Sequence, residues 1–548
     1  MNTTTIKQKH PKGLYYLFFT EMWERFGYYL MIGIFVLYMT DFEKGGLEID
    51  RDIAADIFGT FIALNYLTPF IGGLLADRLL GYRRSIIIGG SLMGAGYLTL
   101  ALPGVTAFYS AMALIVLGNG FFKPNISTLL GNLYSTPENK HMKDSGYSIF
   151  YMGINIGAFI CNFFAAFLRN TYGWGEAFTA AGIGMFVGVI VFIIGQKNYA
   201  HVDVVKPPNP EDTPIVKVLY QVLLPAIATG FAAWFIPGNI FGSDSSDAFL
   251  IGSIPVIAFY ASLYFKANAQ DKKPIGALLS IMAVVVIFWA VFKQNGTALT
   301  TWAQYYTDRE MPTSLIKPTD ALKLSENLTY KLDSSLVLDN KFRKVKDEAG
   351  KPIKSLVYPA YFINDDAKNK IENKETKLIN TELFQSINPF FVIILTPLVI
   401  AFFTFLRRRR KEPSTASKIC WGLFVSAIST LVMVAAVYAC GNGIHKASAL
   451  WLVGTYSVVT VGELFLSPMG LSLVSKLSPV RITAFMMGGW SLATSLGNKL
   501  SGVLAKMWDN YEDKSNFFLV NFILLLIATA LLMLMLKRLN KVLDEYGA

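Results

Sequence analysis

Long apolar stretches recur from one end of this chain to the other, and they constrain its fold more than any other feature of the sequence. Each stretch has about twenty residues or more, the length that an α-helix needs to cross a bilayer core of about 30 Å. We count fourteen candidate membrane-spanning helices. They lie near residues 13–40, 53–79, 84–102, 106–134, 146–168, 176–196, 214–236, 248–266, 275–306, 386–406, 418–440, 449–475, 482–507 and 516–536.

The composition excludes a soluble protein of this length. Only 16% of the 548 residues are charged, whereas soluble domains carry about 25%. The net charge of +11 does not indicate nucleic-acid binding, because the densest basic cluster, residues 407–411, directly follows an apolar stretch. Basic residues in that position usually anchor a cytoplasmic loop. We therefore predict an all-α polytopic protein of the cell (inner) membrane that contacts the lipid bilayer and binds no nucleic acid.

The charges of the short loops predict the orientation. An even number of spans puts both termini on one side, and the side richer in Lys and Arg is cytoplasmic. The loop 41–52 has five acids and two bases, so we expect it to face outward. Basic residues at 83–84, 272–273 and 407–411 fall on the opposite side. Both termini are therefore predicted to be cytoplasmic.

Two polar segments interrupt the succession of apolar stretches. Residues 197–213 are polar and Pro-rich, which indicates a linker. Residues 307–384 contain 14 Lys+Arg and 13 Asp+Glu, and we expect this insertion to be extracytoplasmic by the parity of the spans. Within it, residues 335–345 and 353–363 flank KDEAGKP, a pattern that predicts a β-hairpin.

Ionisable residues inside predicted spans are candidates for function, because each costs about 2.5–3.5 kcal/mol to insert. Structural ion pairs between helices are the alternative interpretation. The charges lie on four widely spaced spans, which favours a shared central cavity. They are Glu21, Glu24 and Arg25 in the first span, and Lys123, Lys293 and Glu463 in three later ones.

The remaining reactive residues do not indicate an enzyme. The three cysteines lie in or beside apolar stretches and have no metal-ligand spacing, and the four histidines lie in loops or tails without a catalytic cluster. A Gly-rich loop with the Walker spacing is missing from the sequence, which argues against ATP as the energy source. We predict no enzyme activity, no metal site and no cofactor.

Several motifs resemble one family of transporters. The segment 72–84, GGLLADRLLGYRR, fits the loop motif of the major facilitator superfamily. EMWERFGYY (residues 21–29) resembles the E-x-x-E-R-F-x-Y-Y motif of the proton-dependent oligopeptide transporter (POT) family. FYMGINIGAF (150–159) and GELFLSPMGLS (462–472) resemble the signatures of that family's fifth and tenth helices. The resemblance covers roughly residues 13–306 and 385–540, and the insertion lies outside it.

The resemblance implies a fold and a function. It implies a major facilitator fold with a six-helix bundle in residues 1–199, a linker with two additional transmembrane helices in 200–274, and a second six-helix bundle in 275–548 that contains the insertion 307–384. The implied function is a monomeric, proton-coupled symporter that imports di- and tripeptides by alternating access. A transporter of another small zwitterionic or anionic solute, and a peptide-sensing receptor on a transporter scaffold, are the alternatives.

The chemistry of a peptide assigns roles to the charged residues. Arg25 and Lys123 suit the carboxylate of a zwitterion, and Glu463 suits its ammonium group. Similarity to the family implies the same assignment and adds residues that would line the pocket, namely Tyr28, Tyr29, Tyr66, Asn155, Trp289, Asn388 and Trp490. Glu21 and Glu24 are the predicted proton acceptors, because protonating either acid would free Arg25 for the substrate carboxylate.

Two positions depart from the family pattern. Family members commonly carry an arginine and an acid that are thought to pair across the outer gate, and here the matching positions are Ile32 and Lys293. An apolar residue at 32 is electrostatically compatible with a lysine at 293. We predict that Lys293 pairs instead with Glu21 or Glu24, so that proton coupling depends on the first-helix motif.

Overall fold

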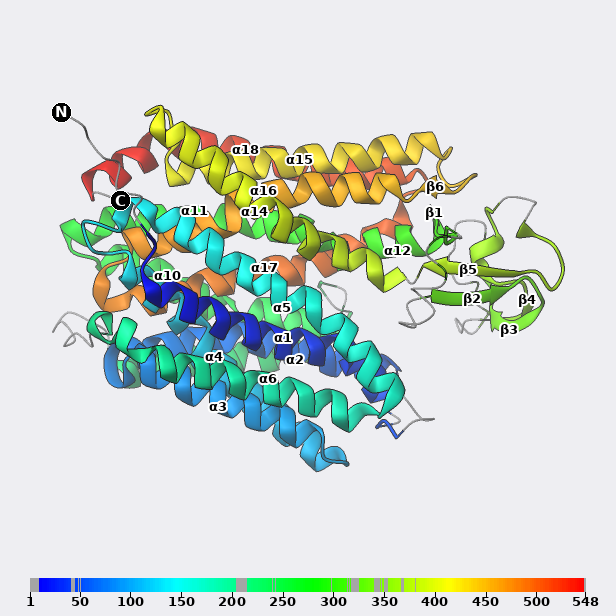
Figure 1. Cartoon of the computed structure of the whole chain (residues 1–548), viewed down its shortest axis with the longest axis horizontal. Helices are drawn as coiled ribbons and strands as arrows, with labels where there is room; N and C mark the ends of the chain where they lie inside the picture. The colour runs from blue at the N-terminus through cyan, green and yellow to red at the C-terminus, as the bar shows by residue number, and fades with distance from the viewer. Residues whose placement is uncertain are drawn as a thin grey trace.

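The structure is a computed structural model and describes residues 9–40, 45–47, 49, 51–203, 214–238, 240–241, 243–296, 298–312, 314, 316, 325–339, 345, 347–348, 353–365, 369–379 and 381–546. Its long helices lie side by side along one axis (Figure 1). Much of the predicted outward loop 41–52, the linker residues 204–213 and the hairpin turn at 349–352 lie outside the described residues.

The N-terminal bundle consists of the first six long helices. They are α1 (Lys12–Thr40), α2 (Arg51–Leu75), α3 (Tyr82–Leu100), α4 (Val105–Leu133), α5 (Lys143–Thr171) and α6 (Trp174–Gly195). A π-helical turn, Ala76–Leu80, extends α2. Small residues allow close packing here, because a Cβ at Gly72 or Gly89 would overlap the backbone of α4.

Two helical hairpin arms follow the N-terminal bundle. The first arm comprises α7 (Ile215–Val218), a π-helical turn (Leu219–Leu223) and α8 (Leu224–Trp234), and the second comprises α9 (Asp244–Gly252) and α10 (Ile254–Lys266). The Tyr260 hydroxyl donates to the Phe485 carbonyl at 2.9 Å, and the two rings stack with centroids 4.8 Å apart. These contacts fix the second arm against α17 (Thr483–Lys506) of the C-terminal half.

Among the described residues, the C-terminal bundle contains the remaining long helices and the short helix α12. They are α11 (Ala269–Phe292), α12 (Ala298–Tyr305), α14 (Ile387–Arg408), α15 (Thr415–Ala439), α16 (Leu450–Leu477), α17 (Thr483–Lys506) and α18 (Lys514–Glu545). The sequence predicts one helix over 275–306, but a 3₁₀ turn, Lys293–Gly296, separates α11 from α12. The sequence Gln-Asn-Gly-Thr explains the break, because Asn, Gly and Thr are poor helix formers.

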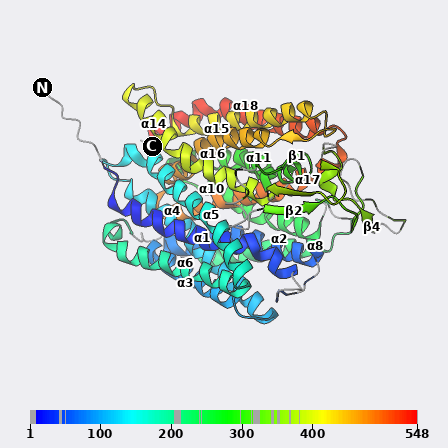
Figure 2. The same ribbon diagram turned by 45° about the vertical axis from the view of Figure 1, so that its right-hand side comes forward.

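Ten helices among the described residues are long and apolar enough to cross a membrane by length and composition. Four further long helices, α1, α2, α3 and α17, have 29, 25, 19 and 24 residues. The start of α1 and the end of α18 lie at the same end of the bundles (Figures 1 and 2). The strands of the 307–384 segment lie at the opposite end (Figure 1).

The described residues of the 307–384 segment take part in three short two-stranded sheets. In the first sheet, β1 (Thr307–Asp308) is parallel to β6 (Ala447–Ser448) of the α15–α16 loop. The second sheet pairs β2 (Ser325–Thr329) with β5 (Glu375–Ile379), and the third pairs β3 (Asp333–Leu336) with β4 (Lys354–Val357), both antiparallel. The third sheet lies near the predicted hairpin but differs from it, because β3 overlaps the predicted strand 335–345 only at residues 335–336 and much of the predicted turn lies outside the described residues. The second strand ends before Pro359, because proline has no N–H to donate to a ladder.

The 307–384 segment and the end of α12 contact the α15–α16 loop of the C-terminal bundle. The Ala447 N–H donates to the Tyr306 carbonyl at 2.7 Å, and Lys446 Nζ donates to Asn364 Oδ1 at 3.1 Å. Lys446 also lies 3.7 Å from the centre of the Tyr361 ring. Burial in this contact lowers the pKa of Lys446 to about 8, with Asp365 acting in the opposite direction.

Candidate functional site

A cavity of about 570 Å³ lies between the two bundles. Helices α1, α2, α4 and α5 supply one wall, and α11, α14, α16 and α17 supply the other. Twelve of the residues selected from the sequence line it. They are Glu21, Arg25, Tyr29, Ile32, Tyr66, Lys123, Asn155, Trp289, Lys293, Asn388, Glu463 and Trp490.

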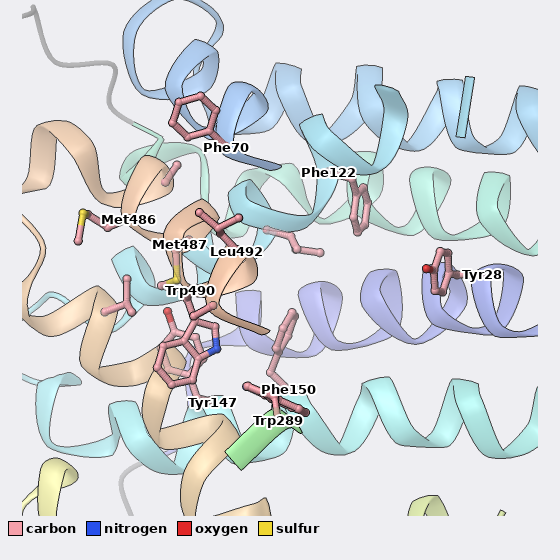
Figure 3. Packing of buried hydrophobic residues seen from close by; sticks show 14 of the residues in the cluster. Tyr28, Phe70, Phe122, Tyr147, Phe150, Trp289, Met486, Met487, Trp490 and Leu492 are labelled. Carbon is pink, nitrogen blue, oxygen red and sulfur yellow. The ribbon is translucent and has the colours of Figure 1, made fainter. Parts of the chain in front are cut away.

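Two predicted residues, Glu24 and Tyr28, do not line this cavity. Glu24 is fully buried, and Tyr28 belongs to the hydrophobic cluster between the helices (Figure 3). Helical geometry explains the difference, because residues 21, 25, 29 and 32 follow one stripe of α1 at spacings of three and four. Residues 24 and 28 lie on the neighbouring stripe. The expectation that Tyr28 lines the pocket is therefore corrected.

Arg25 is held by both acids of the first-helix motif. Glu24 accepts hydrogen bonds from Nε and Nη2 of Arg25, a bidentate arrangement, whereas Glu21 Oε1 lies 3.4 Å from Nε. Within the described residues, Glu21 Oε2 is buried without a hydrogen-bond partner. Glu21 is therefore the more weakly held acid, and it is the one that faces the cavity.

Lys123 is stabilised by an aromatic ring. Its Nζ lies 4.2 Å from the centre of the Tyr66 ring, within the range of a cation–π interaction. The described part of the chain places no carboxylate in ion-pair contact with this ammonium group. Its charge is therefore available to an anion that enters the cavity.

Glu463 lies on the opposite wall and accepts hydrogen bonds from both bundles. Asn388 donates to Oε2 at 2.8 Å, and the Tyr151 hydroxyl donates to Oε1. Sequence reasoning missed Tyr151, although its spacing of four from Asn155 puts both side chains on one face of α5. Trp490 packs nearby against α16, where a Cβ on Gly470 would overlap its ring.

The predicted pairing of Lys293 with Glu21 or Glu24 is wrong for this structure. Lys293 Nζ lies over the rings of Trp289 and Phe292, 5.8 and 6.0 Å from their centres. Both acids contact Arg25 instead, because Arg25 lies on the same helix and one guanidinium can reach both carboxylates.

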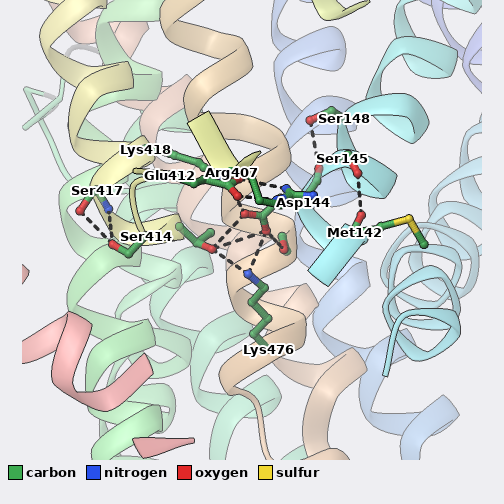
Figure 4. A network of polar contacts seen from close by, with 12 residues as sticks. Met142, Asp144, Ser145, Ser148, Arg407, Glu412, Ser414, Ser417, Lys418 and Lys476 are labelled. Carbon is green, nitrogen blue, oxygen red and sulfur yellow. Dashed lines mark hydrogen bonds and ion pairs between the residues drawn. The ribbon is translucent and has the colours of Figure 1, made fainter. Parts of the chain in front are cut away.

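A buried polar network joins the bundles at the end that carries the termini (Figure 4). Asp144 of α5 contacts Lys418 of α15 at 2.8 Å and Lys476 of α16 at 3.0 Å. Lys418 also contacts Glu412 at 2.7 Å, and Arg407 contacts the same carboxylate. Partial burial acts to raise the pKa of Glu412, but Arg407 and Lys418 hold it below its usual value.

A second polar contact closes the same end. Asp77, in the π-helical turn that extends α2, accepts hydrogen bonds from the backbone N–H groups of Ala484 and Phe485 at 3.2 and 2.8 Å. These N–H groups begin α17, where a helix leaves donors without partners and favours negative charge. Contacts between the bundles therefore close the cavity at the end where α1 begins and α18 ends.

Two bundles of membrane-length helices that share a buried, charged cavity closed at one end define a membrane transporter of the alternating-access type. The sequence profile of the POT family matches residues 83–323 and 367–520. The chain belongs to the POT family, which confirms the resemblance noted from the motifs.

Named relatives and a solved structure agree with this assignment. The chain is 28% identical over 546 residues to a di-/tripeptide transporter of Lactococcus lactis, covering 98% of this chain and 97% of the relative. It is 30% identical over 560 residues to the peptide transporter YePEPT of Yersinia enterocolitica, covering 98% and 96%. A crystal structure of the peptide transporter POT in complex with sulfate aligns with a TM-score of 0.64 and 30% identity, covering 97% of this chain and 96% of that chain.

Proposed function

We propose that this chain is a proton-coupled symporter that imports di- and tripeptides. The observation that carries the proposal is that groups suited to both ends of a peptide face each other across one cavity. Arg25 and Lys123 lie on one wall with Glu21, and Glu463 lies on the other wall with Lys293. A short peptide is a zwitterion with a variable middle. Its carboxylate would contact Lys123 and Arg25, and its ammonium group would contact Glu463. Relatives named as di-/tripeptide transporters support this substrate class.

The size and lining of the cavity also support a small peptide. Its volume of about 570 Å³ falls within the range of about 300–1,000 Å³ for small-molecule sites. Tyr29, Tyr66, Trp289 and Trp490 offer aromatic surface, which can contact different side chains without selecting one shape.

The geometry of α1 suggests how protons are coupled to transport. Protonating Glu21 removes one of the two negative charges beside Arg25 and leaves Glu24 as its partner. The guanidinium of Arg25 then has one negative neighbour fewer, so it attracts the substrate carboxylate more strongly. The proton gradient would supply the energy, without a cofactor.

We further propose a topology of fourteen transmembrane helices. They are α1–α6, the two arms α7–α8 and α9–α10, α11 with α12, and α14–α18. This topology preserves the predicted division at 1–199, 200–274 and 275–548, with both termini cytoplasmic and the insertion 307–384 extracytoplasmic. The protein would act as a monomer in the cell (inner) membrane. The conformation described here is then closed toward the cytoplasm.

A counterflow experiment tests the substrate class. Liposomes that contain the purified protein are loaded with unlabelled dialanine and diluted into labelled dialanine. We expect rapid exchange, competition by unlabelled di- and tripeptides, and no competition by free alanine, which cannot reach both walls of the cavity. Competition by alanine as strong as by dialanine would contradict the proposal and favour another small zwitterion.

The closure of the cytoplasmic end is also testable. Asp144→Asn leaves Lys476 without its ion pair, and breaking a buried pair costs about 3–5 kcal/mol. We expect conformations open to the cytoplasm to become populated. The measurement is labelling of Leu471→Cys, a cavity position, by an impermeant maleimide in inverted vesicles, relative to the chain without the added cysteine.

Lys273→Gln is the matched control for Asp144→Asn. It removes an exposed ion pair with Glu545 near the same end, and we expect it to leave labelling unchanged. If Leu471→Cys is labelled no faster in Asp144→Asn than in Lys273→Gln, the polar network does not keep the cytoplasmic end of the cavity closed.

A further inference from the structure

A groove on the outside of the molecule lies between α5 and α14, apart from the central cavity, and has a volume of about 490 Å³. The two helices belong to different bundles and pack against each other. Ile149 and Met152 of α5 and Ala401 and Phe405 of α14 give the groove a mainly apolar lining. Phe405 keeps 49% of its surface exposed, so the groove opens outward. On a helix that spans a membrane, an exposed apolar groove of this kind faces lipid.

The groove follows one stripe of α14. Thr396, Ile400, Thr404 and Arg408 all line it, and their spacing of four places them one above the other on one face of the helix. From Thr396 to Arg408 the stripe measures about 18 Å along the helix axis. One leaflet supplies half of a bilayer core of about 30 Å. The groove therefore has about the length of a lipid acyl chain, and Arg408 lies at the end where the headgroup of that lipid would be.

Two arginines at this end of the groove form no ion pair within the part of the chain that the structure describes. Arg408 lines the groove, and the guanidinium of Arg409 lies over the Phe405 ring, 4.2 Å from its centre. Glu412, the next acid along the sequence, is held by Arg407 instead, with Nη2 3.0 Å from Oε1 (Figure 4). The charges of Arg408 and Arg409 are therefore available to an anion outside the protein.

Charge and position together select the occupant of this groove. A basic pocket between membrane helices at the cytoplasmic side favours an anionic lipid headgroup, because a phosphate accepts charge-assisted hydrogen bonds from a guanidinium. A soluble anion would gain nothing from the apolar lining. A zwitterionic phospholipid would fill the groove equally well, but it carries a cation of its own beside the phosphate.

We propose that the groove between α5 and α14 binds one anionic phospholipid of the cytoplasmic leaflet. An acyl chain lies along the stripe from Thr396 to Thr404, and the phosphate contacts Arg408 and Arg409. The lipid thus touches both bundles at the seam between them. The choice of leaflet rests on the proposed topology, whereas the binding itself does not depend on peptide transport.

The test is native mass spectrometry of the purified, delipidated full chain, titrated with dioleoyl phosphatidylglycerol or dioleoyl phosphatidylcholine. The two lipids share their acyl chains and differ in the net charge of the headgroup. For the wild-type chain we expect the first phosphatidylglycerol molecule to bind roughly tenfold more tightly than the first phosphatidylcholine molecule, because only the former brings a net negative charge to the two arginines.

Paired variants assign the headgroup contact. Arg408→Gln combined with Arg409→Gln should weaken phosphatidylglycerol binding roughly thirtyfold, since each arginine beside an anionic headgroup contributes about fivefold in affinity. Arg410→Gln combined with Lys411→Gln is the matched control. It removes the same charge from the same basic cluster at two residues that do not line the groove, and should change the affinity less than about threefold.

A second pair of variants tests the acyl-chain contact with all the arginines in place. Ala401→Phe fills the groove and should weaken the binding of both lipids roughly tenfold. Leu398→Phe is its control, because Leu398 is exposed on the same helix and does not line the groove. This control should bind both lipids as the wild-type chain does.

Three results would overturn the inference. They are equal wild-type affinity for the two lipids, an equal loss in the Arg410→Gln, Lys411→Gln control, and undiminished binding by Ala401→Phe. The readout is lipid binding, so its failure is distinct from that of the proposed function. A chain that binds phosphatidylglycerol at this groove but carries no peptide would contradict only the proposed function. A chain that carries peptide without preferring this lipid would contradict only this inference.

Discussion

Glu463→Gln is expected to reduce dialanine uptake by roughly a hundredfold, because truncating one partner of a buried, hydrogen-bonded charge pair costs about 2–5 kcal/mol. The amide keeps the shape of the side chain and can still contact Asn388 and Tyr151. It removes the negative charge that faces the substrate ammonium group. The measurement is the initial rate of labelled dialanine uptake into liposomes, normalised to the amount of inserted protein.

Glu545→Gln is the matched control for Glu463→Gln. It makes the same chemical change in an exposed ion pair with Lys273, far from the cavity, and should leave uptake within a factor of about two. An uptake rate for Glu463→Gln equal to that of this control would remove Glu463 from the substrate site.

The second large effect concerns Glu21. Glu21→Gln mimics the protonated acid permanently, so we expect it to abolish accumulation driven by a proton gradient while counterflow of dialanine continues. Its Oε2 has no hydrogen-bond partner among the described residues, so the substitution breaks few contacts. Both activities are measured in the same liposomes, with and without an imposed pH gradient.

Glu24→Gln distinguishes the two acids of the motif. Glu24 is fully buried and holds Arg25 in a bidentate pair, so we expect its loss to impair counterflow as well as accumulation. Normal gradient-driven accumulation by Glu21→Gln would show that another group carries the proton. If Glu24→Gln kept counterflow and lost only accumulation, the roles of the two acids would be exchanged.

The sequence predicted which residues meet in the cavity better than it predicted how they interact. Charged residues inside apolar stretches are rare because they are costly to insert, and the family motifs occur in a defined order along the chain. Arg25, Lys123 and Glu463 can therefore be selected from the sequence without knowing their positions in space. Which stripe of α1 faces the cavity depends on the rotation of the helix about its axis, and the motif alone does not determine this rotation. In the structure Glu21 and Arg25 line the cavity, whereas Tyr28 does not.

Contacts between distant segments were not predictable from local pattern. Asp144, Lys418 and Lys476 each lie near the end of a span, where charged residues are common and carry no special signal. Their meeting depends on the packing of α5 against α15 and α16. The partner of Lys293 was mispredicted for a similar reason, since only the three-dimensional arrangement shows that Arg25 already engages both nearby acids.

The most direct test of proton-coupled peptide transport is the proton flux that a peptide drives. Liposomes that contain the protein and a trapped pH-sensitive dye start at equal pH inside and outside, with a potassium potential that is negative inside. Adding dialanine outside should acidify the interior, whereas adding alanine, or dialanine to liposomes with Glu21→Gln, should not. Entry of labelled dialanine without any acidification would contradict the coupling of protons to peptide transport.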